Sequence, residues 1–224
     1  VNYAIERSPS LREERANFDE GGEAEGDELT KSILDNIQTG FGFTDEEINR
    51  LKGYSKAVGY LESDNEYERE QTGGGPGSGY YQFEVGDNTL GGTDGSGANE
   101  VAINRFLNYA DQNNIKGDLV EEIRGLRGKN IRFSQLSQDQ QDAIFFANYV
   151  KHGRTNTRAL AKGELSYEDE WLDTHWAGHY DKDEEDNLIA NEVRREEKRT
   201  EMSKKLGEIN NLASALYDGL FEDG

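Results

Sequence analysis

The chain has 224 residues and no cysteine, and its 25 basic and 46 acidic side chains give a formal net charge of −21. This charge repels phosphate backbones and anionic lipids, which argues against a nucleic-acid-binding or membrane-docking protein, and no apolar run approaches the roughly 20 residues of a transmembrane helix. Without cysteine there is no disulfide, thiolate nucleophile or cysteine-bound zinc, while 32% charged and 10% aromatic residues predict a compact domain with solvated polar segments.

The first 43 residues are predicted to form a polar arm that contains one short helix. Residues 1–27 are charged and glycine-rich with few apolar side chains, a composition typical of a flexible segment. An amphipathic stretch follows and ends at the break formed by residues 40–42, Gly-Phe-Gly. Its apolar residues are Leu29, Ile33, Leu34 and Ile37.

Residues 44–61 carry the clearest local signal for a helix. Thr44 and Glu47 form a capping box, in which the Thr44 hydroxyl accepts from the Glu47 amide and the Glu47 side chain reaches back. Apolar residues then recur at steps of three or four along one face: Ile48, Leu51, Tyr54, Val58 and Leu61. Glu62 follows at the edge of this stripe, so we expect its carboxylate at the boundary of the core.

A long glycine-rich stretch occupies residues 72–99. Loops of this length inside a domain are usually functional. Its middle, residues 80–85 (Tyr-Tyr-Gln-Phe-Glu-Val), alternates in polarity and predicts a short strand or one arm of a hairpin.

Two helical patterns follow the glycine-rich stretch. The first begins near Asn99, and its apolar residues are Val101, Ile103, Phe106, Leu107 and Ala110. The second opens with another capping box, Ser137 with Gln140, and continues as a strongly apolar segment to about Gly153. This apolar density predicts that the second helix is the central, buried helix of the domain.

The C-terminal part is predicted to be helical and charged. A helix over residues 166–177 carries both tryptophans of the chain. Residues 183–217 have a sparse apolar stripe and predict a long charged helix, or two helices, that forms a packing or interaction arm. We therefore expect a folded domain over residues 44–180, large enough to hold a catalytic site, and a charged helical extension over residues 181–224.

One combination of residues indicates a catalytic site. An acid, Glu62, stands at a helix end, and twenty residues later a glycine-rich loop ends in two tyrosines and Gln82. Cleavage of a glycosidic bond needs a carboxylic acid that is protonated near neutral pH, and partial burial raises the pKa of a glutamic acid toward that range. The helix edge offers such a setting to Glu62. The glycines let the backbone approach a polymer closely, and Tyr80, Tyr81 and Gln82 would stack on and hydrogen-bond its sugar rings.

These residues resemble the motifs of a known family. Glu62-Ser63 and the later Gly79-Tyr80-Tyr81-Gln82 are similar to the Glu-Ser and Gly-Leu-Met-Gln motifs of the lysozyme-like lytic transglycosylases. The longer run over residues 75–84, Gly-Pro-Gly-Ser-Gly-Tyr-Tyr-Gln-Phe-Glu, resembles that of bacteriophage virion-associated members, which open the cell wall during genome entry. The run His-Trp-Ala-Gly at residues 175–178 resembles the family's Tyr-Asn-Ala-Gly motif, although two of the four residues differ.

The resemblance covers about residues 44–180 and implies a mainly α-helical, lysozyme-like fold with a small β-hairpin. It implies that the substrate is the peptidoglycan glycan strand, cut at the β-1,4 bond between N-acetylmuramic acid and N-acetylglucosamine. No cofactor is implied. The chain would be a virion component that acts in the host periplasm or cell wall, and other virion or tail proteins would be its partners.

The resemblance also implies a role for each matching residue. Glu62 would be the general acid and base, because the 6-hydroxyl of the muramyl sugar attacks and closes a 1,6-anhydro ring without a second carboxylate. Ser63 would hold that carboxylate or the substrate's N-acetyl group. The remaining sugar contacts would come from Gly79, Tyr80, Tyr81, Gln82, His175 and Trp176.

Two alternatives remain open. Goose-type lysozymes, a hydrolytic branch of the same superfamily, carry an acid two residues after the matching glutamine, and Glu84 stands there in this chain. An inverting hydrolase would use such a base, about 6.5–9.5 Å from the acid, to activate water; Asp87 is a weaker substitute. The other alternative is a non-catalytic virion protein that retains a degenerate lysozyme-like fold, which the acidic arms and low apolar content favour.

Other residues have structural interpretations or weak metal-binding patterns. Of Tyr80 and Tyr81, we expect one in the core and one against sugar, and Trp171 is expected to pack in the core. His175 and His179 stand four residues apart, but no third ligand is evident, so we predict no metal. The acidic run over residues 181–192 imitates a calcium loop but has an aspartate where the sharp turn requires glycine.

Overall fold

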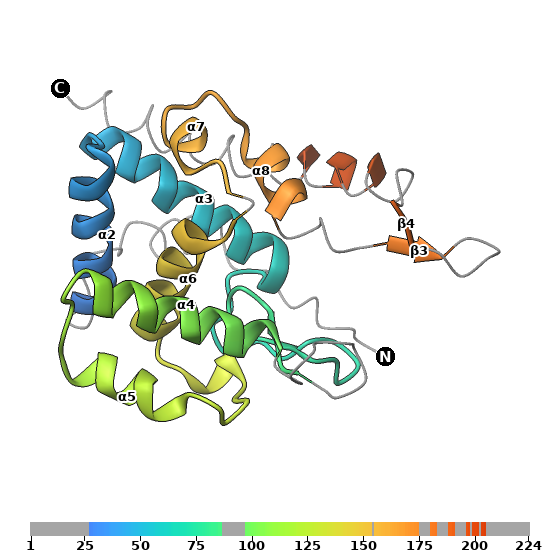
Figure 1. Cartoon of the computed structure of the whole chain (residues 1–224). Helices are drawn as coiled ribbons and strands as arrows, with labels where there is room; N and C mark the ends of the chain where they lie inside the picture. The colour runs from blue at the N-terminus through green and yellow to red at the C-terminus, as the bar shows by residue number, and fades with distance from the viewer. Residues whose placement is uncertain are drawn as a thin grey trace, which may run out of the picture.

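A computed structural model describes residues 27–86, 97–153 and 155–174, with shorter stretches at 180–182, 188–190, 196–197, 199–201 and 203–204. These parts of the chain are mainly α-helical with a small antiparallel hairpin, β1–β2, in the glycine-rich region, as the sequence predicts, and a second strand pair, β3–β4, that it does not predict (Figure 1). The helices and strands are α2 (Glu28–Phe41), α3 (Asp45–Ser63), β1 (Gly77–Ser78), β2 (Phe83–Glu84), α4 (Ala98–Gln112), α5 (Asp118–Leu126), α6 (Gln138–Lys151), α7 (Thr157–Ala161), α8 (Tyr167–Thr174), β3 (Tyr180–Lys182) and β4 (Leu188–Ala190).

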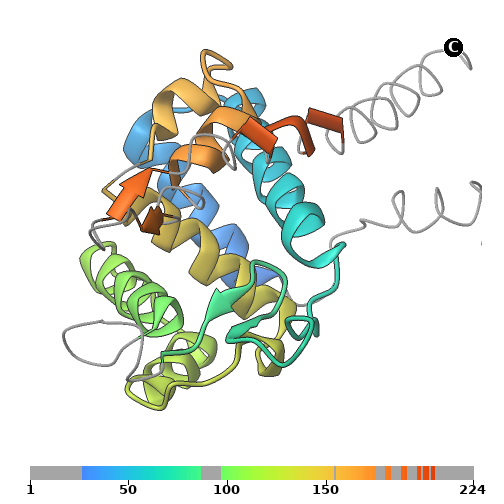
Figure 2. The ribbon, with the colours of Figure 1, turned by 90° about the vertical axis from the view of Figure 1, so that its right-hand side faces the viewer.

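The central helix is α6, which confirms the prediction from its apolar density. Its capping box is present: the Ser137 hydroxyl accepts from the Gln140 amide at 3.2 Å, and the Gln140 side chain accepts from the Ser137 amide at 3.1 Å. Helices α2 and α4 pack against it, and Figure 2 shows α6 running between α3 and α4. Its buried apolar and aromatic side chains are Ala143, Ile144, Phe145, Phe146, Ala147 and Tyr149.

Helix α3 begins and ends close to the predicted residues. The Thr44 hydroxyl accepts from the Glu47 amide at 3.2 Å, and the Glu47 carboxylate accepts from the Thr44 amide at 2.8 Å, which confirms the capping box. The helix stops after Ser63 because Asp64 adopts the left-handed conformation. Its apolar stripe is buried as predicted, with Ile48, Leu51, Tyr54 and Val58 in the core and Leu61 packed against it.

Helix α2 belongs to the same hydrophobic core, whereas the sequence assigned it to a polar arm that ends at residue 43. Ile33 and Ile37 are fully buried, and the helix packs on α6. Its first amides are satisfied by a distant acid: the Asp139 carboxylate of α6 accepts from the Leu29 and Thr30 amides at 3.1 and 2.7 Å. The boundary expected at residue 44 therefore falls inside one packed body, and residues 1–26 lie outside the described residues.

The described first part of the glycine-rich stretch, residues 72–86, forms a minimal hairpin, while residues 87–96 lie outside the described residues. Strands β1 and β2 are antiparallel, with Gly77 opposite Glu84 and Ser78 opposite Phe83. Residues 79–82 make the turn, so the strand expected over residues 80–85 is reduced to two residues. The physical reason is positive φ at Gly79 (+78°) and Gln82 (+48°), which reverses the chain where the alternating pattern alone predicts extension.

Two segments differ from the sequence analysis. Helix α5, which packs on α4, was not predicted. Residues 188–190, expected to be helical, form strand β4 and pair with β3 in the register Tyr180 to Ala190. Helical residues occur later, at 196–197, 199–201 and 203–204, and the rest of the predicted tail helix lies outside the described residues.

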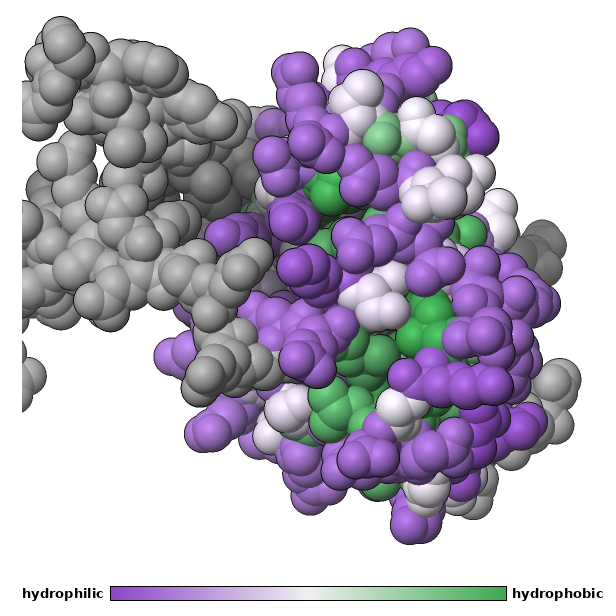
Figure 3. Space-filling model, turned by 90° about the vertical axis from the view of Figure 1, so that its left-hand side faces the viewer, coloured by the Kyte–Doolittle hydropathy of each residue, from purple (hydrophilic) through white to green (hydrophobic). Residues whose placement is uncertain are grey.

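The face of the described residues that Figure 3 shows is largely polar. In Figure 3 hydrophobic side chains form separate patches among hydrophilic ones on one face. In the part of the chain that the structure describes, no helix combines the length and the apolar character needed to cross a bilayer.

Candidate functional site

Glu62 lies in the last turn of α3, half-buried, at the edge of the core where the sequence predicts it. Its Oε1 accepts a hydrogen bond of 3.0 Å from the indole Nε1 of Trp171 on α8. Trp171 is only 6% exposed, so its ring lies in the core as expected while its N–H reaches the carboxylate. The contact joins residues 109 positions apart in the chain.

Helix α8 is anchored by the residue that precedes Trp171. Glu170 is 0% exposed and accepts hydrogen bonds from the Tyr149 hydroxyl at 2.7 Å and the Asn156 amide at 3.1 Å. Burial raises the pKa of Glu170, although these hydrogen bonds act in the opposite direction. One turn later, the Tyr54 and Thr174 hydroxyls share a hydrogen bond of 3.2 Å, which ties α8 to α3.

The hairpin turn packs against the same end of α3. The ring of Tyr80 lies over Gly59, one turn before Ser63, and the Tyr80 hydroxyl donates to Asn65 Oδ1 at 2.7 Å. These two contacts bring the Glu62-Ser63 pair and the turn over residues 79–82 together. The two motifs that carry the family resemblance are therefore neighbours in space as well as ordered along the chain.

Tyr80 and Tyr81 are both buried, at 5% and 2% exposure, which differs from the expectation that one of them faces sugar. Tyr80 stacks on Tyr67 with ring centroids 4.2 Å apart. Tyr81 stacks on Phe145 of α6 at 4.0 Å. Both rings hold the turn on the body of the protein, and neither offers a face on which a sugar could stack.

A half-buried carboxyl group on α6 accepts hydrogen bonds from two tyrosine hydroxyls at the turn. Asp142 accepts from Tyr81 at 2.6 Å and from Tyr67 at 2.9 and 3.0 Å. Burial is the main cause that raises the pKa of Asp142 to about 6; the neighbouring Asp27 and Asp139 raise it further, and the two tyrosine hydrogen bonds act in the opposite direction. This carboxyl group fastens the hairpin turn to the central helix.

Backbone groups of the turn are paired partly with residues outside it, since the Tyr80 amide donates to Gln141 Oε1 of α6 at 2.8 Å. The Gly79 amide donates to the Arg69 carbonyl at 2.8 Å, and the Gly79 carbonyl accepts from the Gln82 side chain at 2.9 Å. A Cβ at Gly79 would stand 2.5 Å from Gln141 Oε1 and 2.8 Å from Phe133 Cβ. Gly79 is therefore required for close packing, and the half-buried Gln82 closes the turn with its amide nitrogen.

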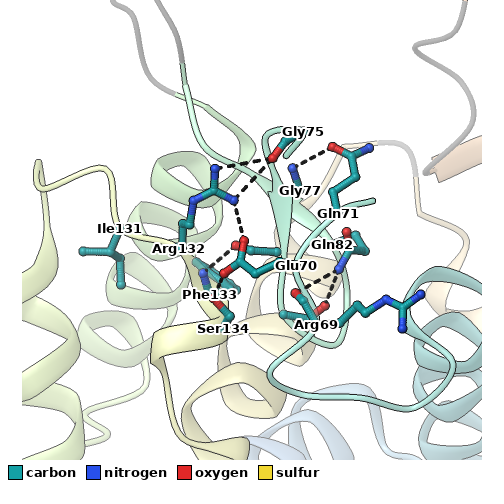
Figure 4. Close-up of polar contacts among 12 residues, drawn as sticks. Arg69, Glu70, Gln71, Gly75, Gly77, Gln82, Ile131, Arg132, Phe133 and Ser134 are labelled. Carbon is teal, nitrogen blue, oxygen red and sulfur yellow. Dashed lines mark hydrogen bonds and ion pairs between the residues drawn. The ribbon is translucent and has the colours of Figure 1, made fainter. Parts of the chain in front are cut away.

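Figure 4 shows the polar contacts that hold residues 70–77 of the glycine-rich loop, several of them from Arg132 and Ser134. Arg132 donates to the Glu70 carboxylate at 2.5 Å and to the Gly75 carbonyl at 3.3 Å, and the Ser134 hydroxyl also donates to Glu70. Gln71 accepts from the Gly77 amide at 3.0 Å. These contacts give residues 70–77 a defined path beside the turn, although they contain four glycines.

The remaining expected site residues lie in varied places. Ser63 is 1% exposed, and its hydroxyl donates to the Gly59 carbonyl at 2.8 Å within α3, so it is used inside the helix. Glu84 is exposed on β2. His175, Trp176, His179 and Asp87 lie outside the described residues.

Sequence reasoning did not find the groups that support Glu62 and the turn. Asp142 and Glu170 are two among 46 acidic residues, and neither stands in a motif that marks it. Trp171 was placed in the core, but nothing local shows that its N–H faces Glu62. Among the described residues, no group of three His, Cys, Asp or Glu side chains is arranged to hold a metal ion.

Comparison of the chain with protein families, with curated proteins and with solved structures gives no match. The functional proposal therefore rests on the geometry of the described residues and on the resemblance of the chain's motifs.

Proposed function

We propose that this chain is a lysozyme-like lytic transglycosylase that cleaves the β-1,4 bond between N-acetylmuramic acid and N-acetylglucosamine, with Glu62 as general acid and base. One observation carries the proposal. The half-buried Glu62 at the end of α3 accepts from Trp171, and the Gly-Tyr-Tyr-Gln turn packs on the same helix end through Tyr80 and Gly59. Glycosidic cleavage requires a carboxylic acid that can protonate the leaving oxygen, and Glu62 is the group proposed to supply it.

The proposed reaction uses one carboxyl group twice. Glu62 first gives its proton to the glycosidic oxygen, and the bond from that oxygen to the anomeric carbon of the muramyl sugar breaks. The resulting carboxylate then takes the proton of the muramyl 6-hydroxyl, whose oxygen bonds to the anomeric carbon. The products are a free sugar hydroxyl and a 1,6-anhydro ring, and Glu62 is protonated again. The Trp171 N–H supports the carboxylate between the two steps.

A hydrolase that uses Glu84 as base is the second candidate. The observation that favours it is the position of Glu84 on β2, exposed and two residues after Gln82. In that reaction water takes the place of the muramyl hydroxyl and leaves a reducing end. The virion location and virion partners are also part of the proposal, and their support is the resemblance of residues 75–84 to phage sequences.

The test is mass spectrometry of the soluble fragments released from purified peptidoglycan by the wild type, Glu62→Gln and Glu84→Gln. The glutamine variants keep the shape of the side chain and remove the transferable proton. We expect 1,6-anhydromuramic ends from the wild type and from Glu84→Gln, and at least a 100-fold loss with Glu62→Gln. Reducing ends that vanish in both variants would establish the hydrolase instead. No fragments from any of the three proteins would favour a non-catalytic structural protein.

A further inference from the structure

Trp171 contacts the proposed acid from a distant part of the chain through a directional hydrogen bond. Its indole Nε1 lies 3.0 Å from Glu62 Oε1, within the normal range for an N–H···O bond. The ring is nearly fully buried, and Leu172 beside it is completely buried. The indole is therefore held in place by packing, and its N–H points toward one chosen oxygen.

The chemistry of the indole group makes this contact informative. An indole nitrogen donates a hydrogen bond and never accepts one. Oε1 of Glu62 must therefore be the acceptor whether the carboxyl group is charged or neutral. The bond therefore persists in both protonation states and holds the carboxyl group in one orientation.

We propose that Trp171 is a positioning residue for Glu62: its N–H binds Oε1 and fixes the orientation in which the carboxyl group gives and takes its proton. This inference rests on the proposed function of Glu62. The hydrogen bond strengthens when Glu62 becomes a carboxylate, because bonds to charged acceptors are stronger than bonds to neutral ones. Trp171 thus supports the charge that forms when the proton leaves for the glycosidic oxygen.

Anchoring of α8 explains how Trp171 keeps this geometry. Glu170, next in the chain, is tied to Tyr149 of α6 and to Asn156 before α7. Thr174, one turn later, donates to the Glu170 carbonyl at 2.8 Å and shares a hydrogen bond with Tyr54 of α3. Helix α8 is therefore bound on both sides of Trp171, and rotation of the helix that would withdraw the N–H is opposed.

The first test does not depend on catalysis. The full chain labelled with ¹⁵N has two tryptophans and hence two indole N–H signals, and the signal missing in Trp171→Phe is that of Trp171. We expect this signal to move with pH in the wild type and to stay in place in Glu62→Gln. A Trp171 signal that does not respond to pH, or that responds equally in Glu62→Gln, would overturn the inference.

The second test uses the pH dependence of fragment release. Phenylalanine keeps the aromatic packing and removes the donor, so Trp171→Phe should lower the maximal rate roughly 10- to 100-fold and move the alkaline limb of the profile to higher pH. Leu172→Val is the matched packing control, and its alkaline limb should coincide with that of the wild type. An unchanged limb in Trp171→Phe, or an equal movement in Leu172→Val, would overturn the positioning role. A wild type without activity whose Trp171 signal follows Glu62 would instead overturn the proposed function.

Discussion

The ring of Tyr80 lies so close to Gly59 that a Cβ at Gly59 would stand 1.7 Å from Tyr80 Cε1. The ring of Tyr80 also stacks on the ring of Tyr67, and the two ring centroids are 4.2 Å apart. Helix α3 therefore has a notch at residue 59, and the aromatic residue of the turn fills it. The absence of a side chain at one helical position determines where the glycine-rich turn can lie.

Replacing Gly59 by alanine should displace the turn. Because Tyr80 is held by Tyr67 and Asn65, it cannot move aside without losing these contacts, and we expect the free energy of unfolding to fall by about 1–3 kcal/mol. Urea denaturation measures the loss. Gly125→Ala in α5 is the matched control, since a Cβ there meets nothing within 4 Å, and it should leave stability unchanged or raise it by up to about 1 kcal/mol. Equal effects of the two substitutions would contradict the notch.

Asp142 should make stability depend on pH. The pKa of its carboxyl group is raised to about 6 in the folded protein, mainly by burial. A raised pKa favours the protonated, folded form, so this contribution is complete below about pH 4 and is lost as the pH rises through 6. The difference in unfolding free energy between wild type and Asp142→Asn should therefore change by on the order of 2 kcal/mol between pH 4 and pH 8, in favour of the wild type at low pH.

The comparison with Asp142→Asn removes the effect of other groups. Asparagine still accepts hydrogen bonds from Tyr67 and Tyr81 but does not titrate. The other carboxyl groups are the same in both proteins, so their contributions largely cancel in the difference. A difference that stays constant from pH 4 to pH 8 would show that burial of Asp142 is not coupled to folding.

Asp139 should stabilise the start of α2. Its carboxylate accepts from the Leu29 and Thr30 amides, which have no partner inside their own helix. We expect Asp139→Ala to lower the free energy of unfolding by about 1–2 kcal/mol and to speed hydrogen exchange at these two amides. Gln138→Ala, one residue earlier and exposed, should change neither. Protected amides in Asp139→Ala would refute this tertiary cap.

Arg132 should order the glycine-rich loop with little effect on the whole fold. It is bound to Glu70 and to the Gly75 carbonyl at the surface, so Arg132→Ala should cost less than about 1 kcal/mol of stability. Hydrogen exchange at the Gly77 and Gly79 amides should nevertheless become faster. Arg124, whose exposure of 38% is close to the 36% of Arg132, pairs with Asp111 away from the loop. Its alanine variant should leave both amides unchanged.

Features that depend on neighbouring residues were predictable from the sequence. Both capping boxes, Thr44 with Glu47 and Ser137 with Gln140, are closed by groups three residues apart, and both are present. The burial of α6 follows from its apolar density alone. The position of Glu62 at the edge of the core follows from the stripe that precedes it.

Features that depend on distant residues were not predictable. The amides of α2 are capped by an acid about 110 positions away, and the indole that meets Glu62 comes from 109 positions away. The sequence around Tyr80 and Tyr81 does not show whether these side chains face the core or the solvent. Tyr80 is buried because Gly59, a distant residue without a side chain, leaves room for its ring. Strand β4 was mistaken for helix because a sparse apolar stripe in a charged segment fits either period.

Asp142 and Tyr149 stand seven residues apart on one face of α6, and each holds a different flank of the candidate site: Asp142 the hairpin turn, Tyr149 the start of α8. Seven residues of α-helix rise about 10.5 Å, so the helix fixes the spacing between the two attachment points along its axis. Side-chain substitutions along α6 do not change that spacing. A single inserted residue between them would lengthen it by about 1.5 Å and rotate one attachment point by about 100° away from its partner. The length of this segment is therefore under a stricter constraint than its composition.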